Sequence, residues 1–528
     1  MNEQWRRTAS VGRPDWQTAG VPSIEEFLAR VEQRRSLTSA ALDPKVRAAW
    51  GQFFTPRASA GLVASMAPLP AAEDWRLIDP GAGVGSLTAA LVARWLAETD
   101  LPSMSVLAYE IDPKLMEPLE ATLAEARALA AGVGRRLDTT VCEANFVLSP
   151  PAAGAGNILL MNPPYKKLSA SSDERAALAC GERPVRVTNL YAAFLVCAMR
   201  ALAPGDGLVA ITPRSFANGP YFRDLRSDLL MRASFRRIHV FEARDRVFAD
   251  ADVLQENIIF SMQLGTSPTN IAITTSRDAI ENLSVVTRHP DQVVHPNDPQ
   301  RFIRLPLDED ALSIAEHMGE MPCTLSELGC SVSTGRVVDF RSKEQLRETP
   351  CAGAVPLIYP QNLRAGQVEW PVVTRKPQAL LLTAETASLV LPNEHYVVVK
   401  RFSAKEEPRR VVAAIASPET FGQAEVVAYE NHLNVFHIAN RGLDPQSAAG
   451  LAAYLNSRFV DDYVRQFNGH TQINATDLRE LRYPTAAQLR TLGFAAASLS
   501  NPVDPDALDE LLDSVVIHPV AETLAAAA

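Results

Sequence analysis

The alternation of strand-like and helix-like segments that begins at residue 75 constrains the fold of this chain most. An apolar run is followed by a glycine-rich turn and an apolar-periodic helix, and this rhythm continues to about residue 262. The predicted strands are 75–78, 104–109, 139–142, 158–161, 208–212, 237–241 and 254–262, and the predicted helices are 86–96, 114–130, 188–202 and 221–231. Such alternation predicts a doubly wound α/β fold, with helices on both faces of a mainly parallel, Rossmann-like sheet. Ligands of that architecture bind beyond the carboxyl ends of the strands.

The chain needs more than one domain, because 528 residues exceed what a single hydrophobic core holds. Past the sheet, helical stretches mix with short β-like runs, which predicts a second, mixed α+β domain after a Pro- and Asp-rich connection at 289–310. The predicted parts are an N-terminal helical arm (1–45, with a helix at 24–35), the domain of the parallel sheet (46–310), the second domain (311–500) and a tail (501–528).

Charge and cysteine usage exclude several classes of protein. A net charge of −10 argues against a protein that coats nucleic acid nonspecifically, but not against a local DNA-binding cleft. No apolar run approaches the length of a membrane span, and the first 20 residues are too polar for a secretory signal. The six cysteines lack a CxxC pair, and the nine histidines form no cluster beside them. We therefore expect a cytoplasmic protein without disulfides, bound metal or membrane association.

Basic residues gather in two segments. They are Arg223, Arg226, Arg232, Arg236 and Arg237 in the first, and Lys400, Arg401, Lys405, Arg409 and Arg410 in the second. The default interpretation of such clusters is a solvated face, so neither predicts a nucleic-acid contact by itself.

The turn after the first strand carries glycines at 81, 83 and 85, which let a ligand approach the backbone closely. Glu110 ends the second strand, where an acidic side chain can bind both hydroxyls of a ribose. The turn begins with Asp79-Pro80 and does not match GxGxxG, so NAD fits less well. The Asp-Pro-Gly-Ala-Gly form is more typical of S-adenosylmethionine sites, whose cofactor has no pyrophosphate.

A second motif, Asn162-Pro163-Pro164-Tyr165, follows the buried strand 158–161. The two prolines fix φ and remove two backbone donors, which leaves nearby carbonyls free to accept hydrogen bonds. An amide, a free carbonyl and an aromatic face on one stiff turn suit a planar group that carries an NH2. Taken alone, the motif is also compatible with an ordinary strand-to-loop turn.

Taken together and in order, these motifs resemble those of the gamma-class DNA adenine-N6 methyltransferases, the TaqI-like group. The residues that carry the resemblance are Phe54-Thr55-Pro56, Asp79 to Gly83, Glu110-Ile111-Asp112, Asn145-Phe146, Asn162 to Tyr165, Tyr191 to Phe194 and Pro213 to Phe222. It covers residues 50–265. More loosely, to about residue 485, the chain resembles modification enzymes of the PstI and BsuBI type through Lys400 to Ser403, Asn431 to Asn434 and Gly469 to Gln472.

The resemblance implies S-adenosylmethionine as cofactor and assigns its contacts. The cofactor-binding residues would be Thr55 (methionine carboxylate), Asp79, Gly81, Ala82 and Gly83 (methionine portion), Glu110 (ribose), Ile111 and Phe146 (adenine faces), Asn145, Asn162 and Phe194 (pocket lining). Many members carry Asp where this chain has Asn145. An amide oxygen can accept the same bond from the cofactor's adenine amine, without charge assistance.

The chemistry at Asn162 follows from the substrate. An exocyclic adenine amine is a poor nucleophile, so the Asn162 side-chain oxygen and the Pro163 carbonyl would hold its two N–H bonds and aim the nitrogen at the methyl group. No strong base is needed, and positioning supplies most of the acceleration. The adenine must be flipped out of the duplex and stacked between aromatic faces, for which we predict Tyr165 and Phe222. Phe222 could instead be a core residue, in which case Tyr221 takes its role.

We therefore predict a sequence-specific DNA adenine-N6 methyltransferase. It either protects host DNA from a cognate restriction endonuclease or is a solitary enzyme without such a partner. Two alternatives are a methyltransferase that acts on RNA or a protein glutamine and a noncatalytic DNA-binding defence subunit. The large second domain argues against the first, and intact Asn162 and Tyr165 argue against the second.

The expected partner is double-stranded DNA, with the protein acting as a monomer and a separate cognate restriction endonuclease left open. Candidate DNA contacts of the second domain are Arg336, His395, Lys400, Arg401, His432 and Gln472, and Gln255-Glu256-Asn257 is a candidate pocket segment. For each of these contacts a structural role competes with base readout.

Overall fold

The computed structural model describes residues 23–68, 75–180, 183–241, 256–267, 269–276, 284–403, 406–499 and 504–517. Predictions for residues 1–22, 254–255, Lys405 and the end of the tail lie outside these residues. The chain divides into two compact units, one comprising Met1–Phe216 and Tyr221–Pro296 and the other Ala217–Pro220 and Asn297–Ala528. We call them the sheet unit and the C-terminal unit.

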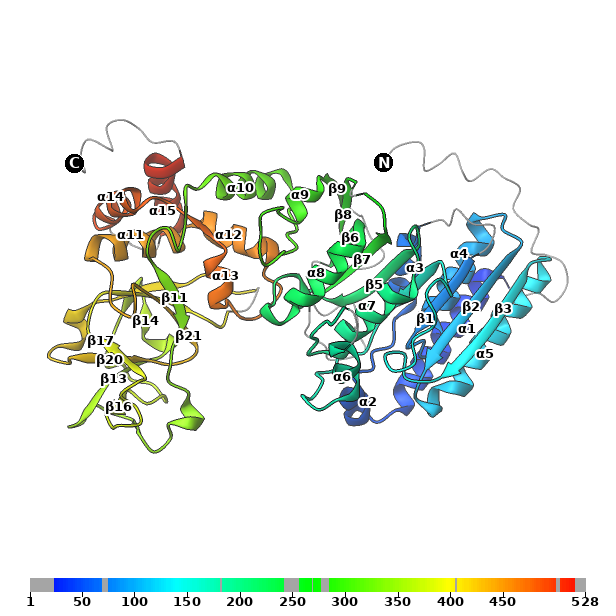
Figure 1. Ribbon diagram of the computed structural model, residues 1–528, viewed down its shortest axis with the longest axis horizontal. Helices are drawn as coiled ribbons and strands as arrows, with labels where there is room; N and C mark the ends of the chain where they lie inside the picture. The colour runs from blue at the N-terminus through cyan, green and yellow to red at the C-terminus, as the bar shows by residue number, and fades with distance from the viewer. Residues whose placement is uncertain are drawn as a thin grey trace. The chain divides into compact units, whose positions relative to one another are not determined.

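The sheet unit is built on one nine-stranded sheet within the described residues, in the order β3-β2-β1-β4-β5-β7-β6-β8-β9 (Figure 1). Its strands are β1 (Trp75–Pro80), β2 (Ser103–Glu110), β3 (Arg136–Glu143), β4 (Ile158–Met161), β5 (Gly207–Pro213), β6 (Ala233–Phe241), β7 (Asn257–Leu264), β8 (Ile271–Ser276) and β9 (Ser284–Arg288). Strands β1 to β5 run parallel, whereas β7 is antiparallel to both β5 and β6. The order reverses between β1 and β4, which is where a doubly wound sheet opens a ligand crevice.

Helices of the sheet unit form two groups. Its helices are α1 (Ile24–Ala41), α2 (Pro44–Trp50), α3 (Arg57–Met66), α4 (Ser86–Glu98), α5 (Pro113–Gly132), α6 (Asp173–Ala179), α7 (Leu190–Ala201), α8 (Arg223–Arg232) and α9 (Pro290–Val293). Helices α1, α3, α4 and α5 contact one another, and α7 contacts both α6 and α8. All four residues of β4 are at most 1% exposed, as expected for a parallel strand buried on both faces. The predicted fold class is confirmed.

The N-terminal segment differs from the prediction of a separate arm. Helix α1 starts with a capping box between Ser23 and Glu26 and buries Phe27 and Val31 in the hydrophobic core of the sheet unit. It is therefore part of that unit. Strands β8 and β9 were not predicted from the sequence. The boundary between the two units falls after residue 296 of the chain, earlier than the predicted boundary at 310.

The C-terminal unit is mixed α+β, as predicted. Its strands are β10 (Cys323–Thr324), β11 (Ser331–Thr334), β12 (Leu346–Arg347), β13 (Ala354–Ile358), β14 (Leu363–Arg364), β15 (Gln367–Val368), β16 (Ala379–Leu381), β17 (Val390–Pro392), β18 (Tyr396–Lys400), β19 (Ala413–Ala416), β20 (Val426–Tyr429), β21 (Leu433–His437) and β22 (Arg482–Tyr483). Its helices are α10 (Glu309–Glu320), α11 (Pro445–Leu455), α12 (Arg458–Phe467), α13 (Ala475–Arg479), α14 (Ala486–Ala496) and α15 (Pro505–Leu512). The predicted helix 445–459 is two helices, because Ser457 caps α12 through the Val460 N–H. Helix α15 buries Leu508 and Leu512, and Val515 and Val516 follow in the same hydrophobic core, so the part of the predicted tail at 504–517 packs on this unit.

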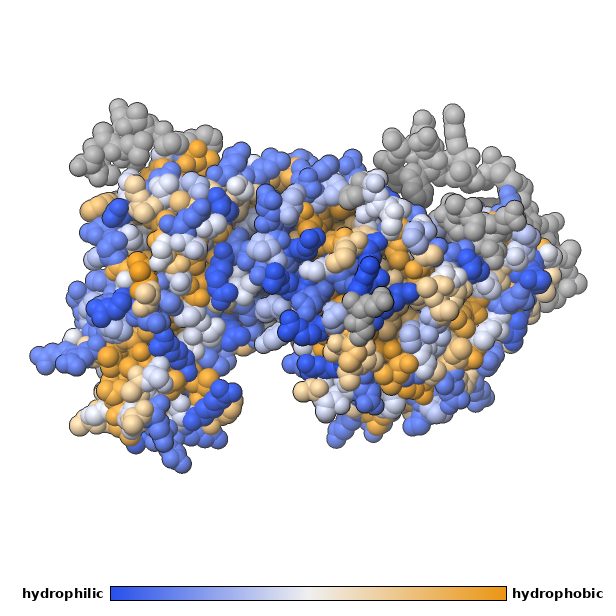
Figure 2. Space-filling view, viewed as in Figure 1, coloured by the Kyte–Doolittle hydropathy of each residue, from blue (hydrophilic) through white to orange (hydrophobic). Residues whose placement is uncertain are grey.

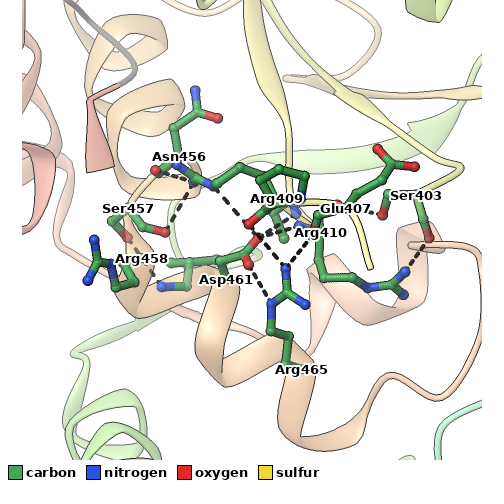
Figure 3. A network of polar contacts seen from close by, with 12 residues as sticks. Ser403, Glu407, Arg409, Arg410, Asn456, Ser457, Arg458, Asp461 and Arg465 are labelled. Carbon is green, nitrogen blue, oxygen red and sulfur yellow. Dashed lines mark hydrogen bonds and ion pairs between the residues drawn. The ribbon is translucent and has the colours of Figure 1, made fainter. Parts of the chain in front are cut away.

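The basic segment at 400–410 is largely structural rather than a solvated face. Arg410 is 1% exposed, and Asp461 on α12 accepts hydrogen bonds from the backbone N–H groups of Arg410 and Val411 and from Arg465 Nε (Figure 3). Arg409 approaches the same carboxylate at 3.8 Å. These bonds satisfy a buried charge and dock α12 on the loop that follows β18.

The other basic segment is also engaged. Arg226 is fully buried and donates to the Phe216 carbonyl, Arg232 pairs with Asp228 at 2.9 Å, and Arg237 donates to the Ser65 carbonyl. These side chains hold α8 and β6 in place, which leaves them little freedom to contact phosphates.

On the face shown in Figure 2, hydrophilic residues alternate with smaller hydrophobic patches, and neither kind dominates the surface. Such mixing is usual for protein surfaces. None of the helices in the described part of the chain is both long and apolar enough to cross a membrane. Across the same residues, no cluster of three or more His, Cys, Asp or Glu side chains could hold a metal ion.

Candidate cofactor and target-base site

One cavity opens at the carboxyl ends of β1, β2 and β4, where the strand order reverses. Its lining includes every residue predicted to bind the cofactor, namely Thr55, Asp79, Gly81, Ala82, Gly83, Glu110, Ile111, Asn145, Phe146, Asn162 and Phe194. Pro163, Tyr165 and Phe222, which were predicted for the target base, are not among its lining residues. The structure thus brings the predicted cofactor residues together in a single cavity.

The glycine-rich turn after β1 is held open by its backbone geometry. Gly81, Gly83 and Gly85 all have positive φ, between 58° and 83°, where other residues are strained. The N–H groups of Gly81 and Ala82 both donate to the Tyr109 carbonyl at 2.9 Å. A side chain at position 81 would point at the Phe194 ring and one at 83 at the Phe54 ring, each about van der Waals distance away. Glycine therefore keeps both the turn and the cavity floor open.

Asp79 is a buried carboxylate at the end of β1. Its Oδ2 accepts a hydrogen bond from Thr88 Oγ1 at 2.6 Å, and the residue is 1% exposed. Burial raises the pKa of Asp79 to about 7, and no cationic side chain of the described residues lowers it. A carboxylate of this kind is suited to a ligand that brings its own positive charge.

Glu110, at the end of β2, organises the loop around it. Its Oε2 accepts from the Gly83 N–H at 2.8 Å, and Oε1 accepts from the N–H groups of Ile111 and Asp112 at 2.8 and 2.9 Å. Burial raises the pKa of Glu110, although these three bonds favour the ionised form. The carboxylate is fixed between the two loops and still has lone pairs to accept from hydroxyl groups.

Asn145, after β3, does not present a free acceptor. Its Oδ1 accepts from the N–H groups of Val147 at 2.9 Å and Leu148 at 3.3 Å, closing a tight turn. Its Nδ2 donates to Glu174 Oε1 on α6 at 3.0 Å. The expectation that the Asn145 oxygen accepts from a cofactor amine does not fit this geometry, because both lone pairs are taken.

Asn162 is oriented by the segment that precedes α3. Its Nδ2 donates to the Phe53 carbonyl at 2.7 Å and to Thr55 Oγ1 at 3.0 Å. Since the nitrogen is fixed on this side, Oδ1 faces the other way, where it accepts from the Tyr165 hydroxyl at 3.1 Å. One lone pair of Oδ1 remains for a further donor.

Close backbone contact holds the Asn162 loop. Gly51 has a φ of 68°, its carbonyl accepts from the Tyr165 N–H at 3.1 Å, and an added Cβ would lie 2.9 Å from the Tyr165 backbone. Across the described backbone, no N–H outside regular helices and strands donates to the Pro163 carbonyl, as the double proline predicts. The loop is therefore rigid and retains a free acceptor.

The aromatic residues predicted to stack on the target base are linked by a continuous series of ring contacts. Tyr165 packs on Phe53 with ring centroids 5.5 Å apart and on Tyr191 at 6.2 Å, and Tyr191 stacks on Phe222 at 5.5 Å. Phe222 is 5% exposed, whereas its neighbour Tyr221 is 73% exposed. In this structure Tyr165 and Phe222 lie on either side of Tyr191 and do not enclose an open slot, so their roles in base stacking stay predictions.

Several cavity residues were not predicted. Phe53 and Phe54 directly precede Thr55, so the motif itself could have suggested them. Trp50 and Lys166 line the cavity with the ammonium 5.9 Å from the ring, and Glu174 lies on a helix that the sequence did not predict. Their proximity depends on folding of segments far apart in the chain, and no local pattern marks it.

The candidate DNA contacts of the C-terminal unit fall into one cluster and several isolated side chains. The Phe402 ring packs on the His432 ring with centroids 4.8 Å apart, and the Phe402 backbone forms an isolated β-bridge with Gln472. Arg401 donates to the Asn431 carbonyl and to Gln472 Oε1. Lys400 pairs with Glu407 at 2.7 Å. Thus the motifs at 400–403, 431–434 and 469–472, which are distant in sequence, meet in space.

The remaining candidates lie apart from that cluster. Arg336 donates to the Ser388 carbonyl and to Asn440, and His395 lies 4.0 Å from Glu419. In the sheet unit, Glu256 pairs with Arg214 at 2.7 Å and Asn257 is paired within β7, which is a structural role for that segment.

No protein-family model matches the chain. The type II methyltransferase M.PstI of Providencia stuartii is 38% identical over 472 residues, which cover 88% of this chain and 92% of the relative. The chain belongs to the type II methyltransferases of restriction–modification systems. M.BsuBI of Bacillus subtilis is 36% identical over 506 residues, which cover 94% of this type II methyltransferase and 99% of M.BsuBI. The resemblance to PstI- and BsuBI-type modification enzymes is confirmed.

A solved structure supports the fold of this type II methyltransferase. The Type IIL restriction-modification enzyme MmeI in complex with DNA matches with a TM-score of 0.50 and 12% identity, covering 96% of this chain and 75% of that chain. At this identity the match supports the fold alone.

Proposed function

We propose that this type II methyltransferase transfers a methyl group from S-adenosylmethionine to N6 of an adenine that is flipped out of duplex DNA. The observation that carries the proposal is the fixed orientation of Asn162. Its nitrogen donates to Phe53 and Thr55, and the residue lines the cavity. Its oxygen accepts from the Tyr165 hydroxyl and from no other donor of the described residues, which leaves one lone pair for a ligand. An amide oxygen in that position is suited to accept from an exocyclic amine.

The residues of the cavity fit S-adenosylmethionine. Asp79 is a buried carboxylate for which the described residues supply no cationic partner, which suits the methionine ammonium. Glu110 suits the ribose hydroxyls, and Ile111, Phe146 and Phe194 supply apolar faces for an adenine. When bound, this cofactor supplies an electrophilic methyl group on a sulfonium, which is an excellent leaving group.

The protein's own contribution is positioning. Asn162 Oδ1 and the Pro163 carbonyl would accept the two N–H bonds of the target amine and turn its lone pair toward the cofactor cavity. The Tyr165 hydroxyl, which donates to Asn162 Oδ1 at 3.1 Å, keeps the amide in this orientation. Such alignment of reacting groups is worth several kcal/mol without any strong base.

A methyltransferase for RNA or for a protein glutamine fits less well. The two relatives are named type II methyltransferases, and the chain carries a C-terminal unit of domain size in which three distant motifs meet around Phe402. A noncatalytic subunit fits less well because the Asn162 geometry is intact. Protection of host DNA from a separate endonuclease follows as the expected biological role.

The proposal is tested by Asn162→Ala. We expect methyl transfer to a duplex substrate to fall by about a thousandfold or more, since the acceptor that orients the amine is lost. Cofactor binding measured by calorimetry should stay near wild type, because the cofactor's charged groups are held elsewhere. Unchanged turnover of the variant contradicts the assignment. Methylation-sensitive long-read sequencing of DNA from an expressing host then gives the recognition sequence.

A further inference from the structure

Glu174 is a carboxylate of the cofactor cavity to which no motif assigns a role. It is the second residue of α6, whose start is capped by Ser172 through the Arg175 N–H. Its side chain lines the cavity together with Asn145 and Phe146, which lie 29 and 28 residues earlier in the chain. Oε1 of Glu174 accepts from Asn145 Nδ2 at 3.0 Å.

Hydrogen bonds within the protein engage both the oxygen and the nitrogen of the Asn145 amide. Its oxygen accepts two backbone N–H groups, from Val147 and Leu148, and its nitrogen is directed at Glu174. Asn145 therefore orients the carboxylate. Oε2 of Glu174 receives no hydrogen bond from any residue that the structure describes, so this oxygen is available to a donor of a bound ligand.

Apolar side chains suited to packing on the face of an adenine ring line the same cavity as this carboxylate. Phe146 and Phe194 have ring centroids 5.3 Å apart, and Ile111 lines the same cavity. An adenine packed against such apolar side chains needs an acceptor for its exocyclic amine, since an unpaired N–H in a buried site loses its hydrogen bond to water. A carboxylate makes a stronger bond to that amine than a neutral amide does.

We propose that Glu174 accepts the hydrogen bond of the exocyclic amine of the cofactor's adenine, and that Asn145 positions it. The pair would thus replace the single carboxylate that many related enzymes carry at position 145. This inference rests on the proposed use of S-adenosylmethionine.

The test is calorimetry with two ligands, S-adenosylhomocysteine and S-inosylhomocysteine, in which a carbonyl replaces the amine. Wild type should bind the adenosyl ligand more tightly. Glu174→Ala should weaken adenosyl binding by about 10- to 100-fold, the loss expected for a bond to a charged acceptor, and should leave inosyl binding almost unchanged. Glu174→Gln should shift the preference toward the inosyl ligand, because an amide can donate to the carbonyl.

Two further variants separate this role from others. Asp173→Asn removes the neighbouring charge of the same helix turn and should leave both affinities unchanged, which controls for an effect on the start of α6. Asn145→Asp in the Glu174→Ala background should restore part of the preference for the adenosyl ligand.

Two results would overturn the inference. Equal weakening of both ligands by Glu174→Ala would assign Glu174 to the cavity wall alone, and no weakening would remove it from the site; in both cases wild-type binding of S-adenosylhomocysteine leaves the proposed cofactor intact. Failure of wild type to bind either ligand would instead contradict the proposed cofactor, and this inference with it.

Discussion

The two halves of the site differ in how complete they are. On the cofactor side, all the residues predicted from motifs line one open cavity, and Glu110 and the glycine turn are already locked by hydrogen bonds. On the target side, Tyr165, Tyr191 and Phe222 fill the space with one another. The difference indicates that the proposed cofactor site is preformed. For the proposed target-base site, we predict that these aromatic side chains move when a base enters.

Among the variants that test the difference between the two sides of the site, we expect the largest loss of ligand affinity at Glu110. Glu110→Ala removes the proposed ribose acceptor and the group that fixes Gly83, Ile111 and Asp112, so cofactor affinity by calorimetry should fall by about 100-fold or more. Glu143→Ala is the matched control, because Glu143 is the exposed register partner of Glu110 on β3. A similar loss in both variants would show that the effect is not local to the cavity.

A smaller effect is expected on the target side. Phe222→Ala should reduce the fluorescence rise of 2-aminopurine at the target position and lower kcat/KM by roughly tenfold, the scale of one lost base–aromatic stack. Tyr165→Ala should act in the same direction, and cofactor affinity should stay unchanged in both. If Tyr221→Ala instead carries the loss, the exposed neighbour is the stacking residue and Phe222 belongs to the core.

These aromatic residues also show what the sequence could and could not predict. Motif order predicted that Asp79, Glu110 and Asn162 lie at one edge of the sheet. The structure has them there, because Asp79 and Glu110 stand at the carboxyl ends of the parallel strands β1 and β2 and Asn162 directly follows β4. It could not foresee that Phe222 stacks on Tyr191 or that Asn145 turns its nitrogen to Glu174, since both depend on packing between distant segments. In the C-terminal unit the short strands give no clear period, so most of them were missed.

The smallest effect concerns the charge of Asp79. In the folded, cofactor-free protein its pKa is raised from 3.8 to about 7, so the folded state holds a proton that the unfolded state releases. Stability is therefore lost as pH rises from about 4 through 7. Asp79→Asn removes this penalty, so its melting temperature should exceed that of wild type by a few degrees at pH 8 and by less at pH 5, at about 2–4 °C per kcal/mol.

Saturating cofactor supplies the control for that prediction. It should stabilise wild type more than Asp79→Asn, because only the carboxylate pairs with the methionine ammonium. A melting difference that is the same at pH 5 and pH 8 would mean that Asp79 does not titrate between the two values. The preformed cofactor side would then lack the charge complementarity inferred for it.

The central claim is that this type II methyltransferase modifies the exocyclic amine of adenine in DNA. The direct measurement is mass spectrometry of nucleosides from duplex DNA incubated with the purified protein and methyl-labelled S-adenosylmethionine. Wild-type reactions should yield labelled N6-methyladenine, and reactions with Asn162→Ala should yield none. Labelled N4-methylcytosine or 5-methylcytosine in place of N6-methyladenine would contradict it.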